Sequence, residues 1–245
     1  MKLKLNCDLG ESFGPWKMGI DEAIMPFIDM ANIACGFHAS DPVIMQHTVE
    51  LAVKYNVTIG AHPGYPDLVG FGRRSMKCTP KEIEAFLVYQ CGALEAICKA
   101  NDTQVKYVKP HGALYNDMMS DDKVFTAIIN GLAKYNKNLK LMILSTQNNA
   151  YYKEIANASG IELIYEVFAD RAYTNKGLLV PRIEGGSVIE SKQEILDRIS
   201  LLQQENKLKT ISNENINMQA DSMCVHGDNQ KAVELVKALR EYINK

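Results

Sequence analysis

Short apolar runs alternate along this chain with segments of helical periodicity, and this alternation restricts the fold more than any other feature of the sequence. The runs are rich in branched residues, as is typical of buried strands, and cover residues 2–7, 29–35, 57–61, 105–108, 139–144, 161–168 and 223–225. Strands that alternate with helices are usually parallel and joined by right-handed crossovers. The pattern therefore predicts an α/β fold, either a closed barrel or an open doubly wound sheet.

Helix start signals between these runs support the same organisation. Asp41-Pro42 precedes a stretch of helical periodicity that extends to residue 56. Thr79, Pro80 and Glu82 combine an N-cap hydroxyl, a proline at the first helical position and a glutamate placed for a capping box. We expect further helices over residues 121–136, 148–158, 191–206 and 229–244.

The positions of the polar residues favour the barrel. In a barrel, functional groups gather at the carboxyl ends of many successive strands, whereas an open sheet concentrates them near one switch point. Here almost every predicted strand is followed by charged or amide side chains. No linker divides the chain, so we expect one β/α-barrel domain over residues 1–245. Two irregular stretches, 63–77 and 175–187, are typical of lids or rim segments.

Histidines are the most informative of these polar residues. Four of the five follow a predicted strand within a few residues, and the fifth, His47, lies in a helical pattern. A lone histidine in such a position is commonly structural, but four at one barrel face indicate a shared active site. The four are His38, His62, His111 and His226. The side chains that we expect beside them are Asn6, Asp8, Glu11, Asn32, Asp67, Lys109, Asn116, Glu166, Asp170, Arg171 and Asp228.

Imidazoles beside carboxylates are compatible with two kinds of chemistry. They bind divalent metals such as zinc, manganese or iron, and they also act as metal-free general acids and bases. No H-E-x-x-H segment decides between the two, and the candidate ligands come from different strands. Arg73 and Lys109 are candidates for binding an anionic group of a substrate, and pairing with a neighbouring acid is the alternative for Lys109.

The charge balance argues against several classes of partner. The formal net charge is -2, from 27 basic and 29 acidic residues. The sequence therefore lacks the excess of positive charge that is typical of proteins that bind nucleic acid or an anionic membrane. No apolar segment approaches the roughly 18 residues of a membrane span, and the N-terminus lacks signal-peptide features. The six cysteines form no C-x-x-C pair. We therefore expect a cytoplasmic protein that acts on a small molecule. The sequence also lacks the G-x-x-x-x-G-K-[ST] phosphate loop.

Seven motifs, which span essentially the whole chain, carry a resemblance to a known family. In order they are NCDLGES, ANIACGFHASDP, IGAHPGYPDLVGFGRR, VKPHGALYN, EVFADRAY, VPR and VHGD. Together they resemble the family of 5-oxoprolinase A subunits, also called the LamB/YcsF family. The resemblance implies a seven-stranded, TIM-like β/α barrel related to the glycoside hydrolase and deacetylase superfamily. It also implies the opening of 5-oxo-L-proline to L-glutamate with hydrolysis of ATP, performed together with 5-oxoprolinase subunits B and C, which would handle the ATP.

Within that activity we assign roles to the residues of the expected site as hypotheses. Asp8 and His62 are the candidates for general base or water positioning, and His111 for general acid. His38 and His226 would complete the pocket, with Asp170 and Asp228 orienting imidazoles or binding the substrate amine. Arg73, Lys109 and Arg171 would meet the substrate carboxylate or the phosphoryl group. The other residues expected to bind substrate are Asn6, Glu11, Asn32 and Asn116. A divalent metal remains an open alternative.

Two other interpretations of the sequence stay open. The first is a metal-dependent deacetylase or amidohydrolase that acts alone on an N-acyl sugar or another amide, because fold is weak evidence for function. The second is a non-catalytic subunit that binds a ligand and regulates its partners. A stoichiometric bound metal that is lost together with activity on chelation would favour the first, and ligand binding without activity in any combination of partners would favour the second.

Overall fold

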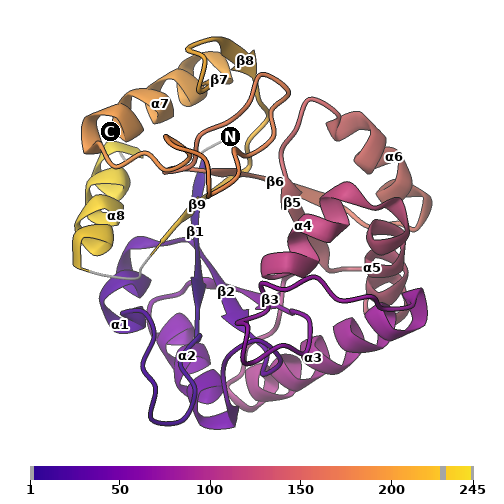
Figure 1. Ribbon diagram of the computed structural model, residues 1–245. Helices are drawn as coiled ribbons and strands as arrows, with labels where there is room; N and C mark the ends of the chain where they lie inside the picture. Colours follow the sequence, from indigo (N-terminus) through magenta and orange to yellow (C-terminus); the bar gives the residue numbers. More distant parts are fainter. Residues whose placement is uncertain (1–2, 227–229, 244–245) are drawn as a thin grey trace.

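The computed structural model describes residues 3–226 and 230–243 and contains a closed barrel of parallel strands ringed by helices (Figure 1). The last of these strands, β9, closes the barrel by pairing with β1 on one side and β6 on the other. All seven predicted strands are present. They are β1 (Lys4–Leu9), β2 (Met30–Ala34), β3 (Thr58–His62), β4 (Tyr107–Val108), β5 (Lys140–Leu144), β6 (Leu163–Phe168) and β9 (Ser222–Val225).

The helices follow the strands and cover the outside of the barrel. The predicted ones are α2 (Pro42–Lys54), α3 (Pro80–Ala100), α5 (Asp122–Tyr135), α6 (Asn149–Ala158), α7 (Lys192–Glu205) and α8 (Gln230–Ile243). Residues 229 and 244 of the last prediction lie outside the described residues. Elements that the sequence patterns did not predict are α1 (Asp21–Ile24), the 3-10 helix η1 (Met25–Phe27), α4 (Gly112–Ser120) and a separate antiparallel pair, β7 (Lys207–Lys209) and β8 (Asn215–Asn217).

Both predicted helix starts are confirmed. The Asp41 carboxylate accepts hydrogen bonds from the backbone N–H groups of Val43 and Ile44, at 2.8 and 3.0 Å. The Thr79 hydroxyl accepts from the N–H of Glu82 at 3.3 Å, and the Glu82 carboxylate accepts from the N–H of Thr79 at 2.7 Å. These bonds satisfy amide groups that have no partner within the helix. They fix where α2 and α3 begin.

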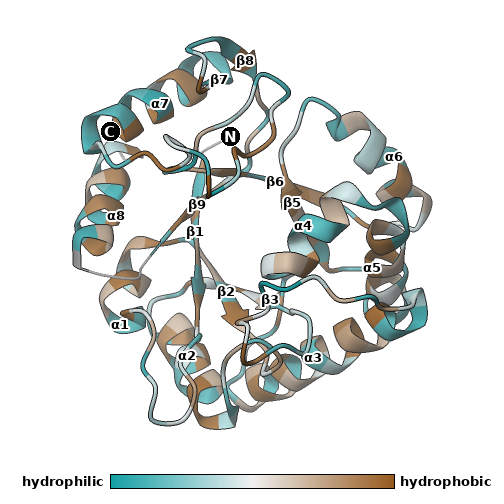
Figure 2. Ribbon diagram, viewed as in Figure 1, coloured by the Kyte–Doolittle hydropathy of each residue, from teal (hydrophilic) through white to brown (hydrophobic). Residues whose placement is uncertain are grey.

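Side chains alternate between the two faces of each strand, and this alternation separates an apolar core from a polar interior. Leu5, Cys7 and Leu9 of β1 belong to the core between barrel and helices, and the helices carry mixed hydrophobic and hydrophilic residues (Figure 2). Asn6 and Asp8, at the alternate positions, form hydrogen bonds with polar groups of other strands. The polar side chains of β1 are therefore directed into the barrel.

A small apolar cluster lies inside the barrel below these polar groups. Met30, Tyr107 and Met142 form this cluster, which is separate from the main core. The Tyr107 hydroxyl donates a hydrogen bond of 2.6 Å to Asn32 Oδ1. The apolar cluster thus supports a polar layer nearer the carboxyl ends of the strands.

The irregular segments follow β3 and β6 and reach the same end of the barrel. The segment after β6 is held by isolated bridges that pair Arg171 with Val188 and Tyr173 with Leu179. Arg73 from the segment after β3 and Arg182 from the segment after β6 both line the cavity described below. Among the described residues, no helix combines the length and apolar character needed to cross a bilayer.

Candidate active site

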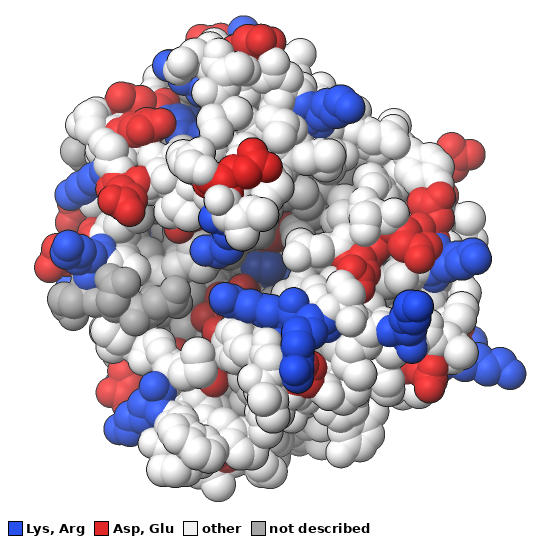
Figure 3. All heavy atoms as spheres, in the orientation of Figure 1, with Lys and Arg blue, Asp and Glu red and all other residues white. Residues whose placement is uncertain are grey.

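A cavity of about 530 Å³ opens at the carboxyl ends of the strands. On this face of the molecule, basic and acidic side chains surround a hollow near the centre (Figure 3). Ten of the residues expected from the sequence line the cavity, although they come from distant parts of the chain. They are Asp8, Glu11, His62, Arg73, Lys109, His111, Asn116, Asp170, Arg171 and His226.

Three further predicted residues lie beside the cavity and are fully buried: Asn6, Asn32 and His38. The Asn32 amide donates to Asn6 Oδ1 at 2.8 Å and to Asp8 Oδ1 at 2.7 Å. The two asparagines therefore act on the cavity through Asp8, and their contact with a substrate stays a prediction. Asp228 lies outside the described residues.

Lys109 pairs with two acids inside the barrel. Its ammonium nitrogen lies 2.8 Å from Asp8 Oδ1 and 2.9 Å from Glu166 Oε1, and the residue is 3% exposed. Burial works to lower the pKa of Lys109, but the neighbouring carboxylates outweigh it and raise that pKa well above its usual range. Of the two partners that the sequence left open for Lys109, the structure shows the neighbouring acid. Binding of a substrate anion by Lys109 stays a prediction.

Glu166 is a site residue to which the sequence motifs assigned no role. It is fully buried, and its Oε2 accepts a hydrogen bond of 2.8 Å from the Tyr115 hydroxyl. The sequence contained one signal for this residue, a carboxylate within an otherwise apolar strand. Charged groups are rarely buried without a partner, so such a carboxylate indicates a buried pair. The partner, Lys109, is 57 positions earlier in the sequence.

Asp8 is held as a carboxylate. Burial would raise the pKa of Asp8, but the neighbouring His62 ring and the Lys109 ammonium outweigh burial and hold this pKa well below its usual range. Asp8 Oδ2 lies 3.4 Å from His62 Nε2. A carboxylate that binds protons so weakly is better suited to stabilise positive charge or to position water than to accept a proton.

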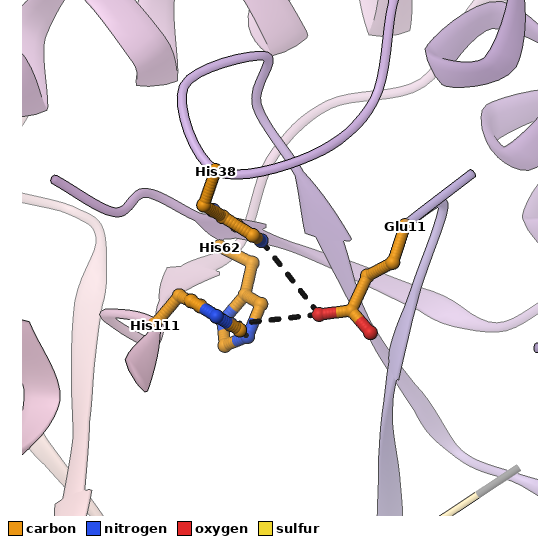
Figure 4. Close-up of side chains that lie close together, drawn as sticks. All are labelled: Glu11, His38, His62 and His111. Atoms are coloured by element: carbon orange, nitrogen blue, oxygen red, sulfur yellow. Dashed lines mark hydrogen bonds and ion pairs between the residues drawn. The ribbon is translucent and has the colours of Figure 1, made fainter. Parts of the chain in front are cut away.

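Three histidines and Glu11 form a compact cluster at one side of the cavity (Figure 4). The rings of His38 and His111 stack with centroids 3.6 Å apart and planes within 1° of parallel. The His62 ring is perpendicular to that of His111, with centroids 4.8 Å apart. Glu11 Oε1 lies 3.6 Å from His38 Nε2 and 3.5 Å from His111 Nδ1.

Burial favours the neutral form of two rings of the cluster, His38 and His111. Burial lowers the pKa of His111 to about 3, and burial also holds the pKa of His38 well below its usual range. At pH 7 both rings are therefore uncharged and hold no extra proton that they could donate. The role of His111 as a general acid stays a prediction that would require a proton from elsewhere.

A second imidazole–carboxylate pair lines the cavity. His226 Nδ1 lies 2.9 Å from Asp170 Oδ2, and both side chains are partly exposed. Burial would raise the pKa of Asp170, but its hydrogen bond with His226 outweighs burial, so this pKa lies below its usual range. The carboxylate thus orients the ring.

The arginines of the cavity differ in how they are held. The guanidinium of Arg171 is buried and donates to the backbone carbonyl of Val180 at 2.7 Å, so it fixes the segment after β6. Arg73 and Arg182 are exposed and line the cavity. The sequence motifs included Arg182 without assigning it a role. These two guanidinium groups suit an anionic part of a ligand.

Two other polar residues of the strand ends lie apart from this chemistry. Asp67 pairs with Arg74, whose Nε donates to Asp67 Oδ2 at 3.0 Å, and neither residue lines the cavity. His47 is exposed on α2, and its Nε2 lies 3.3 Å from Glu22 Oε1. The exclusion of His47 from the expected site agrees with this position.

Comparisons with known proteins support the family resemblance that the sequence motifs carry. A family model described as "LamB/YcsF family" matches residues 3–245. The chain is 52% identical over 240 residues to the 5-oxoprolinase A subunit of Vibrio campbellii, covering 98% of this chain and 95% of that protein. It is 49% identical over 243 residues to the 5-oxoprolinase A subunit of Pyrococcus abyssi, covering 99% of this chain and 94% of that protein.

A comparison with a solved structure supports the fold directly. The crystal structure of a lactam utilization protein from Thermus thermophilus matches with a TM-score of 0.93 and 38% sequence identity. The match covers 100% of this chain and 96% of that one. The seven-stranded barrel is therefore shared over the full length.

Proposed function

Because the chain belongs to the LamB/YcsF family, we propose that it is the A subunit of an ATP-dependent 5-oxoprolinase. In this reaction the lactam ring of 5-oxo-L-proline is opened to L-glutamate, and ATP is hydrolysed to ADP and phosphate. The observation that carries the proposal is 52% identity, over 98% of the chain, to a protein named as the A subunit of 5-oxoprolinase. Such a name implies partner subunits, and we propose that subunits B and C complete the enzyme.

The chemistry of a lactam explains why ATP is needed. The amide is stabilised by resonance, so water attacks its carbonyl carbon slowly unless the oxygen is activated. We propose that the partner subunits transfer the phosphoryl group of ATP to the amide oxygen, because this sequence lacks a phosphate-binding loop. Water then adds to the activated carbon and the ring C–N bond breaks as the nitrogen takes a proton. A second water hydrolyses the resulting acyl phosphate to glutamate and phosphate.

The geometry of the cavity supports a role for this chain in ring opening. The His226–Asp170 pair has the arrangement of an imidazole that delivers a proton, here to the departing nitrogen. Asp8, held by Lys109, stabilises positive charge beside the reacting carbon and positions water. Arg73 and Arg182 meet the anionic groups of the activated substrate.

A reconstitution experiment tests the function. Glutamate is measured from 5-oxoproline and ATP with this chain by itself, with subunits B and C by themselves, and with all three proteins. We expect glutamate only from the full mixture. Turnover of N-acyl substrates by this chain without partners would instead support the deacetylase interpretation, and ligand binding with no turnover in any mixture would support a regulatory role.

Substitution of Asp170 tests the assigned proton transfer. Asp170→Asn keeps the shape of the side chain but removes the charge that orients and stabilises the His226 imidazole. We expect kcat in the reconstituted enzyme to fall by about 100-fold, at the lower end of what general acid–base catalysis contributes. Asp197→Asn, at an exposed position of α7, is the matched control. Turnover by Asp170→Asn close to that of the control would exclude this role.

A further inference from the structure

The His38 ring, beside the cavity, is buried without the hydrogen bonds that such a ring normally makes among the described residues. It is 0% exposed, and within the part of the chain that the structure describes neither of its ring nitrogens has a hydrogen-bond partner. Its Nε2 points toward Glu11 Oε1 at 3.6 Å, which is too long for a direct hydrogen bond (Figure 4). A buried imidazole without a hydrogen-bond partner is costly, so a group between His38 and Glu11 is expected.

The hydrogen bonds of the other two rings fix which of their nitrogens carry protons. His62 Nδ1 lies 2.6 Å from the carbonyl oxygen of Lys109, and His111 Nε2 lies 2.9 Å from that of Phe71. A carbonyl oxygen only accepts, so both of these nitrogens donate. A histidine that binds a metal is neutral, and in that form the remaining nitrogens, His62 Nε2 and His111 Nδ1, would present lone pairs to each other at 2.9 Å.

Negative charge adds to this convergence of lone pairs. Glu11 Oε1 lies 3.5 Å from His111 Nδ1, and Asp8 Oδ2 lies 3.4 Å from His62 Nε2. The Lys109 ammonium is on the other oxygen of Asp8, at 2.8 Å. A cation at the convergence point would turn mutual repulsion into attraction. Backbone carbonyls on the far ring nitrogens are also the usual outer partners of metal-bound histidines.

We propose that Glu11, His38, His62 and His111 bind one divalent transition-metal ion of the zinc class. One candidate ligand atom from each residue lies within 4.8 Å of the other three. Ligands about 2.1 Å from a tetrahedral zinc ion are roughly 3.4 Å apart. The separations of 2.9, 3.5 and 3.6 Å in the cluster bracket that value.

The ligand types indicate which ion. Three imidazoles and one carboxylate suit Zn²⁺, or Co²⁺ as a probe, whereas Mg²⁺ and Ca²⁺ prefer oxygen ligands. Because Glu11, His62 and His111 also line the cavity, an ion here would face the substrate. The inference concerns binding and is independent of the lactam reaction.

Metal titration of the purified chain tests the site without partners, ATP or an activity assay. After treatment with a chelator, the protein is titrated with CoCl₂ and then with ZnCl₂. We expect one Co²⁺ per chain, with the intense visible absorption of four-coordinate cobalt, and its displacement by Zn²⁺. Absence of saturable binding, or the weak absorption of six-coordinate cobalt, would overturn the proposal.

Substitutions localise the ion. His38→Ala and Glu11→Gln should each weaken Zn²⁺ binding by at least about 100-fold, because each removes a ligand. His47→Ala removes an exposed imidazole outside the cluster and should bind Zn²⁺ like the unsubstituted protein. Circular dichroism of each variant checks that it is folded. Undiminished Zn²⁺ binding by a folded Glu11→Gln or His38→Ala variant would place the ion elsewhere and contradict the proposal.

Discussion

Lys109 lies between the carboxylates of Asp8 and Glu166 and is almost completely buried. Removing the central charge of such a buried cluster strongly destabilises the fold, because the remaining charges stay buried without a partner of opposite sign. From the sequence, the lysine and both acids could be placed at strand ends. Pairing of Lys109 with a neighbouring acid was an alternative from the sequence, but the identity of its partners could not be predicted, because it depends on which side of each strand faces the barrel interior.

Replacing Lys109 should therefore be costly for stability. Lys109→Met keeps much of the side-chain volume but leaves two carboxylates facing each other across the site. We expect the free energy of unfolding to fall by about 3–5 kcal/mol, measured by urea denaturation. Lys99→Met, which removes an exposed lysine and its i,i+4 pair with the half-buried Glu95, should change it by less than about 0.5 kcal/mol. Equal effects of the two substitutions would show that the buried pairing contributes little.

Gly72 controls the packing of two histidines. Its φ of +62° lies in the left-handed region, and a Cβ there would be 2.7 Å from His38 Cβ and 2.8 Å from His111 Cδ2. The sequence motif GFGRR contains this glycine, but the motif does not reveal that the residue packs against the two imidazole rings. Loop conformation and ring stacking together explain why no larger side chain fits.

A pair of glycine substitutions separates backbone strain from steric overlap. Gly14 has a similar φ of +53°, but no atom lies within 4 Å of the position that a Cβ would occupy there. Gly14→Ala should cost about 1–2 kcal/mol of unfolding free energy from the backbone alone, whereas Gly72→Ala should cost a further 1–3 kcal/mol or so from overpacking. Thermal or urea unfolding of both variants provides the comparison. Equal losses would mean that the rings move aside without cost.

Two helices with a side-chain cap were predicted from their start signals, whereas helix α4 of the site was missed. Asp41 and Thr79 mark the starts of α2 and α3, and their hydrogen bonds confirm the signals. Helix α4 begins after His111 with no side-chain cap, so no start signal marks it in the sequence. Strands β7 and β8 each have a single apolar residue between two polar ones, so no apolar run marks them in the sequence.

The capping box of α3 gives a prediction at the level of the helix. Thr79→Ala removes the hydroxyl that accepts from the Glu82 N–H, and should lower the free energy of unfolding by about 1 kcal/mol. Thr126→Ala, at an exposed position inside α5, should instead be neutral or raise it by a few tenths of a kcal/mol because alanine favours helix. Chemical denaturation of both variants measures this. A loss as large for Thr126→Ala would mean that the cap is not the cause.

For the molecule as a whole, the sequence predicted that distant residues meet at one end of a barrel. Ten of the expected residues do line one cavity. The stacking of His38 on His111 was beyond such reasoning, because it depends on the paths of the loops after β2 and β4. Strand order fixes which end a residue occupies, but loop geometry decides which rings touch.

Barrel closure also predicts how stability is distributed. Each barrel strand has two neighbours, whereas β7 and β8 pair only with each other among the described strands. We expect amides of β1, β2 and β3 to exchange with solvent only through global unfolding, and those of β7 and β8 to exchange through smaller openings. Native-state hydrogen exchange at increasing denaturant measures both. Exchange of the β7–β8 pair at the global free energy would show that it unfolds together with the barrel.

The position of β9 between β1 and β6 has a consequence for the protein during its synthesis. The ribosome makes β9 and His226 after the other six barrel strands, so a growing chain holds an open sheet with exposed edges for most of translation. Neither the closed barrel nor the His226–Asp170 pair can form before residues 222–226 have emerged. An unfinished chain therefore cannot assemble the complete pocket, and its unpaired β1 and β6 edges are the places where a chaperone would be most useful.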